Sequence, residues 1–125
     1  MHINDLERAT IEARRGWEVT YHELYNLSPE VANAIEGCPD GFSIWHSHFS
    51  QDLLQMKNGE KGLLLDVGWY PHSDPSGSFG LALIGFTPAD EPGQEEEYHW
   101  DRPLLEYQSR DLASLLDKIS QIVKQ

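Results

Sequence analysis

The chain has 125 residues, the length of one domain, and 39% of them are hydrophobic, so a single core can form without disulfides or metals. Nine Lys and Arg residues stand against 21 Asp and Glu residues, which gives a net charge of -12 at pH 7. This charge disfavours direct binding to nucleic acid or to an anionic membrane surface, and it favours a cationic partner.

The sequence also predicts the cellular compartment. No apolar run approaches the roughly 20 residues of a membrane helix, and the opening MHINDLERAT lacks the apolar segment of a signal peptide. The single cysteine, Cys38, cannot form an internal disulfide. We therefore expect a protein of the reducing cytoplasm that binds no membrane.

A surface helix is the first element that the sequence predicts. It covers residues 5–15, with Asn4 as the N-cap and Glu7 three residues later, and Gly16 ends it. Its apolar side is modest. We therefore expect it to lie on the surface of another element.

The next segments alternate between strand and helix signals. Residues 16–24 place Trp17, Val19 and Tyr21 on one face, which is the pattern of a half-buried strand. The pair Ser28-Pro29 then indicates the start of a short helix that runs to about residue 36. Residues 42–50 fit both a helix and a strand, and the sequence leaves both interpretations open.

A hairpin is predicted in the middle of the chain. Residues 52–56 and 63–70 have the composition of two antiparallel strands. Asn58 and Gly59 lie between them and are the residue types that supply positive φ angles in a hairpin turn.

Two further strands and a helix complete the fold. The strands cover residues 79–86 and 98–107, the second of them broken near Pro103 because proline cannot donate to a ladder. A helix over 110–124, capped by Ser109, follows. Its apolar stripe consists of Leu112, Leu115, Leu116, Ile119, Ile122 and Val123. The sequence thus predicts one α+β domain over residues 1–125, with helices on an antiparallel sheet of about four to five strands.

A metal site is conceivable at the His-x-His pair of His46 and His48. On a strand both rings would share a face, with His72, Asp66 or Asp74 as a third ligand. On a helix the rings would diverge by about 200°. Because this spacing is weakly specific, we favour a surface or packing role and predict no metal and no cofactor.

Other catalytic signals are weak. Asp66, within LLLDVGWY, is a candidate general base, but an acid among apolar strand residues is more often satisfied by backbone donors or an arginine. Cys38 lies in a turn-like GCPDG segment, and the glycines of DPSGSFG do not open a helix as a phosphate loop must. The sequence therefore predicts no catalytic residue.

An acidic segment with neighbouring aromatic residues is the candidate partner-binding surface. Residues 87–97, TPADEPGQEEE, exclude a core role, whereas tryptophan and tyrosine are typical interface anchors. The predicted interface consists of Asp90, Glu91, Glu95, Glu96, Glu97, Tyr98 and Trp100. The alternative is that a different acidic face, built from Asp66, Asp74 or the first helix, meets the partner.

Three stretches resemble small bacterial immunity proteins of polymorphic toxin and contact-dependent growth inhibition systems. They are Gly62–Pro71, Asp74–Phe86 and Pro103–Val123, all in the part of the chain from residue 62 onward. The resemblance implies a cytoplasmic α+β protein that binds the C-terminal toxin domain of its own strain's effector, of the contact-dependent inhibition or Rhs type. It implies inhibition by occlusion, so no catalytic residues are carried over.

The charge and the resemblance point to the same kind of partner. Such toxins are often nucleases, whose basic clefts bind phosphate and attract a protein of net charge -12. We expect an inhibitor that neutralises a toxin by tight binding. The alternatives are a small metal-dependent enzyme using His46 and His48, and an acidic adaptor domain.

Overall fold

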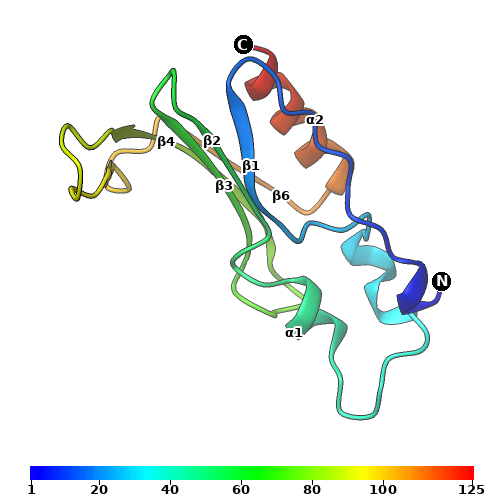
Figure 1. Ribbon diagram of the computed structural model, residues 1–125. Coiled ribbons are helices and arrows are strands. Elements are labelled where there is room, and N and C mark those ends of the chain that lie inside the picture. The colour runs from blue at the N-terminus through cyan, green and yellow to red at the C-terminus, as the bar shows by residue number, and fades with distance from the viewer.

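The computed structural model describes residues 1–125 as one antiparallel sheet with helices against it (Figure 1). The strands are β1 (Trp17–His22), β2 (Leu54–Asn58), β3 (Leu63–Tyr70), β4 (Ser78–Thr87), β5 (Glu97–Tyr98) and β6 (Leu105–Ser109). Their order is β1-β2-β3-β4-β5, and β6 also pairs with β4. The helices are the 3-10 helices η1 (Ile3–Asp5) and η2 (Pro29–Ala34) and the α-helices α1 (Ile44–His48) and α2 (Leu112–Lys124). The predicted α+β fold class is confirmed.

The main core lies between α2 and one face of the sheet, which we call the inner face. Alternate side chains of the central strands point to this face, and those of Met56, Leu65 and Trp69 are inaccessible to solvent. Rings of Trp45, Phe49, Trp69 and Phe79 pack on one another at the end of the sheet next to α1. None of the helices combines the length and the apolar composition that a membrane span requires.

The C-terminal helix has the predicted apolar stripe, with two local corrections. Leu115 is inaccessible to solvent, whereas Leu116 is only partly buried at the edge of the core. The N-cap is Asp111, whose carboxylate accepts from the backbone N–H of Ser114 at 3.3 Å. The predicted cap, Ser109, is wrong because its hydroxyl accepts from the N–H of Asp111 in the preceding turn.

The predicted helix over residues 5–15 is wrong. Only η1 forms, and the following residues are held by backbone pairing instead: Ala9 N donates to Leu24 O at 2.8 Å and Asn26 N donates to Glu7 O at 2.8 Å. A helix of this length is marginal without a strong apolar face. Pairing with residues 24–26 satisfies the same backbone groups and buries Ala9.

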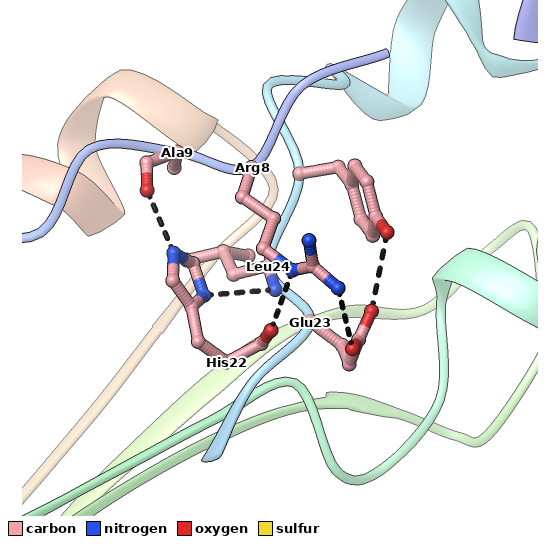
Figure 2. A network of polar contacts seen from close by, with 6 residues as sticks. Arg8, Ala9, His22, Glu23 and Leu24 are labelled. Atoms are coloured by element: carbon pink, nitrogen blue, oxygen red, sulfur yellow. Dashed lines mark hydrogen bonds and ion pairs between the residues drawn. The ribbon is translucent and has the colours of Figure 1, made fainter. Parts of the chain in front are cut away.

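Polar contacts fasten this N-terminal segment to the end of β1, as Figure 2 shows. Arg8 donates to the carbonyl of His22 at 2.9 Å and pairs with the Glu23 carboxylate at 2.9 Å. His22 Nε2 donates to Ala9 O at 2.7 Å, because its Nδ1 accepts from Leu24 N. These bonds place the segment beside residues 22–24.

A β-bulge in β1 changes the direction of one predicted core residue. The register with β2 shifts between Val19 and Tyr21. Tyr21 was expected to share a face with Trp17, but the extra residue turns it away from the core, and it is 46% exposed.

The β2–β3 hairpin forms as predicted, but its turn is different. Asn58 is the last residue of β2 and is fully buried; its side chain donates to Arg15 O at 3.0 Å and accepts from Lys61 N at 3.1 Å. The positive φ of the turn is at Gly62 rather than at Asn58 or Gly59. Asn58 therefore stabilises the turn through its side-chain hydrogen bonds, whereas the sequence predicted a positive φ angle of its backbone.

The remaining segments differ from the predictions only in detail. The short helix predicted after Ser28 forms as the 3-10 helix η2. Residues 42–50, which the sequence left open, contain the helix α1, which begins after its cap Ser43 and buries Ile44 and Trp45. The strand predicted over residues 98–107 forms only at its ends, as β5 and β6, because residues 99–104 form no strand. Beyond β4, the acidic loop (residues 88–96) extends away from the sheet (Figure 1).

Candidate functional site

The face of the sheet opposite α2, the outer face, carries no helix. The buried hydrophobic residues of η2, α1 and α2 belong to the main core cluster on the inner side, and η1 has no buried residue. Leu64 and Ile84 are buried on the outer face and face each other across β3 and β4, outside that cluster. Part of this face, over β3, β4 and β6, is open to contacts with other molecules.

A groove of about 550 Å³, the outer groove, runs over β3, β4 and β6 on this face. Its floor is β4, where Gly80, Ala82 and Ile84 alternate with residues of the inner face. The first two residues have minimal side chains, so the floor is low at Ala82, and the ring of Tyr70 can lie over Gly80. The volume is within the range of about 300–1,000 Å³ that is common for ligand sites.

Two carboxylates flank this floor. Asp66 on β3 is paired in register with Ala82, and Ala82 is paired with Glu106 on β6, so all three side chains project on the same face. Adjacent strands lie about 4.8 Å apart, which separates the backbones of Asp66 and Glu106 by about 10 Å. Both acids line the outer groove, one on each side.

Tyr70 forms one end of the outer groove. Its ring leans over Gly80, where a Cβ atom would lie 3.0 Å from the Cδ2 atom of the ring. Its hydroxyl donates to the carbonyl of Gln51 at 3.3 Å, and the residue remains 44% exposed. The glycine at position 80 therefore allows an aromatic ring to lie along the groove.

Trp100 forms the opposite end, together with Pro103. The turn that carries both residues is held beside Ile84, because His99 N donates to Gly85 O at 3.0 Å and Leu104 N donates to Leu83 O at 2.8 Å. Trp100 is 52% exposed. The other three tryptophans are buried in the core.

A second hollow of about 410 Å³ adjoins the groove and shares Asp66 with it. Tyr21, Asp52 and Gln55 line it. The chain before β2 crosses the outer face above Gly68, where a Cβ atom would lie 2.1 Å from the carbonyl oxygen of Gln51. Because Gly68 has no side chain, this part of the chain can lie directly on the sheet, and Asp52 therefore lies close to Asp66.

The charge of both hollows is negative and uncompensated. No Lys, Arg or His lines either of them. The ion pairs of the protein are Arg8–Glu23, Arg14–Glu12 and Lys57–Glu96, and none involves a groove carboxylate. Burial, together with the charge of Asp52, raises the pKa of Asp66 to about 6. Burial and the Asp66 charge likewise raise the pKa of Tyr70.

These features suit the binding of a cation. Carboxylates supply charge-assisted hydrogen bonds, and the faces of Tyr70 and Trp100 attract cationic groups through their ring quadrupoles. Asp66, considered from the sequence as a candidate base, has no arginine partner here and faces the outer groove.

The residues of the predicted interface are distributed over two locations. Asp90, Glu91, Glu95 and Glu97 are exposed on or beside the acidic loop. Glu96 forms an ion pair with Lys57, and Lys57 lies 5.8 Å from the centre of the Tyr98 ring. Tyr98 packs on Phe86, with ring centres 5.6 Å apart. Among the predicted residues, only Trp100 lines the outer groove.

The two histidines of the His-x-His pair lie on α1 and are directed differently. His46 contacts His72, with ring centres 5.7 Å apart, whereas His48 packs on Tyr25 at 4.8 Å. Burial lowers the pKa of His48. No group of three or more His, Cys, Asp or Glu side chains is arranged to hold a metal ion. Cys38 is partly buried and unpaired.

Tyr70, Glu106 and Asp52 were not predicted as site residues. One signal in the sequence could have indicated the hollow: the small residues Gly80 and Ala82 occupy successive outward positions of a strand. The acids that flank them come from distant segments and become neighbours only through the register of β3, β4 and β6.

Comparisons with protein-family models, with curated proteins and with solved structures give no match for this chain.

Proposed function

We propose that this protein inhibits a cationic partner protein by binding and occluding it, and that the partner is the toxin domain implied by the resemblance to immunity proteins. The observation that carries the proposal is the outer groove, an open acidic hollow with exposed aromatic residues at both ends. Partly exposed aromatic residues surrounded by polar groups are typical of protein interfaces.

The charge distribution supports a basic partner. Asp52, Asp66 and Glu106 lie on the outer face without cationic partners, and the acidic loop adds exposed carboxylates beyond the same sheet. Complementary charges accelerate the encounter of two proteins and select against other partners. A nuclease toxin, whose own substrate is a polyanion, presents such a basic surface.

The two acidic regions suit different steps of binding. The exposed acids of the loop act at long range and steer the approach of the partner. The groove residues are partly enclosed and become desolvated on contact, so they determine the dissociation rate. The proposed interface therefore combines the predicted loop with a groove that the sequence did not reveal.

The proposal places the gene of the toxin domain immediately upstream of this gene, and the test is a protection assay with the product of that reading frame. Expression of that domain should arrest growth of a host cell, and co-expression of this protein should restore growth. Surface plasmon resonance with the inactive toxin domain should show a stable complex. If growth remains arrested although both proteins are expressed and folded, the proposal is wrong.

Matched variants locate the interface. Asp66→Asn combined with Glu106→Gln should weaken the complex at least about tenfold, because two carboxylates that the partner would cover are neutralised. Glu30→Gln combined with Asp40→Asn makes the same change in net charge at exposed positions near η2 and α1. This control should change the affinity less than about threefold. Equal effects of the two variants would exclude the groove from the interface.

A further inference from the structure

We infer that the outer groove is a receptor for one arginine side chain, which the partner inserts between Asp66 and Glu106. This inference rests on the proposed function and specifies which group of the partner the groove binds. The inference is based on the carboxylates on the two sides of the groove and on the aromatic rings at its two ends.

The positions of the carboxylates favour a guanidinium group. Asp66 and Glu106 project from strands on either side of Ala82, whose methyl group leaves the space between them open. A guanidinium presents five N–H donors in one plane and bonds to acceptors on more than one edge. A lysine ammonium is a compact charge that does not span two acceptors in the same way.

The aromatic rings favour the same group. Tyr70 and Trp100 close the ends of the groove, and each keeps about half of its surface accessible, at 44% and 52%. The planar guanidinium stacks on aromatic faces and is weakly hydrated, so it enters a partly enclosed site more readily than an ammonium. The aliphatic part of an arginine would cover Ala82 on the floor.

The unpaired acids provide the driving force. Neither Asp66 nor Glu106 has a cation within the protein, and Asp66 is partly buried beside Asp52. The negative charges of Asp66 and Asp52 repel each other, and a cation that enters the groove compensates this repulsion. It also donates hydrogen bonds to the Asp66 carboxylate, which folding has partly desolvated. Because the groove is open along the sheet face, the side chain can enter while the main chain of the partner remains outside.

The experiment titrates the full-length, 15N-labelled protein with N-acetyl-arginine amide and follows its amide and indole signals. The indole signal of Trp100 is assigned with the variant Trp100→Phe. We expect saturable shifts of that indole and of residues 80–84, with a Kd on the order of 1–10 mM. N-acetyl-citrulline amide, which has a neutral urea group of the same shape, should produce no saturable shift.

Two variant pairs with equal charge change serve as the comparison. Asp66→Asn with Glu106→Gln should weaken arginine binding at least about tenfold. Glu30→Gln with Asp40→Asn, at exposed positions outside the proposed interface, should leave the Kd within about threefold. Thermal melts of both variants confirm that they are folded under the conditions of the titration.

Several results would overturn the inference. These are the absence of saturable shifts at the groove, equal shifts with the citrulline derivative, and equal weakening by the variant at Glu30 and Asp40. Equal affinity for N-acetyl-lysine amide would show that the groove responds to charge alone, and it would refute the arginine assignment.

The titration uses no toxin, so its failure is separate from failure of the proposed function. If arginine does not bind but co-expression restores growth, the arginine site is wrong and the inhibitor proposal stands. If arginine binds at the groove but growth remains arrested, the site stands and the inhibitor proposal is wrong.

Discussion

Replacing Asp66 by asparagine is expected to stabilise the protein at neutral pH. The pKa of Asp66 is raised from its ordinary value of 3.8 to about 6, because folding partly buries the carboxyl group next to Asp52. This difference corresponds to at most about 3 kcal/mol of folding free energy. Because the side chain is partly exposed, solvent screening reduces the expected gain to about 1–2 kcal/mol.

The sign of the effect follows from proton binding. Between about pH 4 and pH 6 the folded protein retains a proton on Asp66 that the unfolded chain has released. The stability contribution of this residue therefore falls as pH rises through that window, and the penalty is complete above it. Asparagine does not titrate, so the variant and the natural protein should have nearly equal stability near pH 4 and diverge towards pH 7.

Urea unfolding of both proteins at a series of pH values between 4 and 8 measures this difference. All other carboxylates are common to the two proteins, so their titration cancels. Asp90→Asn, at an exposed position of the acidic loop, is the control and should change stability by less than about 0.5 kcal/mol. A loss of stability on replacing Asp66 at pH 7, or a gain that does not vary with pH, would refute the reasoning.

Three further predictions concern the core, the outer face and the loop. Leu115→Ala should lower the free energy of unfolding by about 2–5 kcal/mol in urea melts, and Leu116→Ala by less, because only Leu115 is inaccessible to solvent. Gly68→Ala should cost about 1–3 kcal/mol or more in the same assay, because its Cβ would lie 2.1 Å from Gln51 O. Neutralising Glu95, Glu96 and Glu97 as glutamines should slow association with the toxin domain and flatten its salt dependence in surface plasmon resonance, with little change in dissociation; unchanged association at low salt would remove the loop from the interface.

The parts of the fold that the sequence predicted are those with strong local signals. The stripe of α2 repeats over four turns, and the β2–β3 hairpin combines apolar strands with a polar turn. The N-terminal helix was predicted from a cap and a weak apolar side. Its residues pair with residues 24–26 instead, a long-range arrangement that no local pattern contains.

The prediction of side-chain direction was wrong where one extra residue changes the strand register. The bulge after Val19 reverses the direction of Tyr21, although the alternation in the sequence is regular. Likewise, asparagine is common in turns, but Asn58 is buried, and its side-chain amide forms hydrogen bonds with the backbone of Arg15 and Lys61. Both features depend on a neighbouring strand or segment that is distant in sequence.

The candidate site was predictable only in part for the same reason. Asp66 and Trp100 were each noticed in the sequence, but as unrelated features. Their relation depends on two strand registers, which align Asp66, Ala82 and Glu106, and on the turn that carries Trp100 to the same face.

The outer groove combines two features that reduce folding stability. The small side chain of Ala82 leaves a hollow that a larger one could fill, and Asp66 is partly desolvated without a cation nearby. A face that served only to complete the fold would gain stability from a larger apolar residue at position 82 and a neutral residue at position 66. Both features have a physical reason if a cationic group from another molecule enters the groove. Its binding fills the hollow and also compensates the negative charge of the carboxylate.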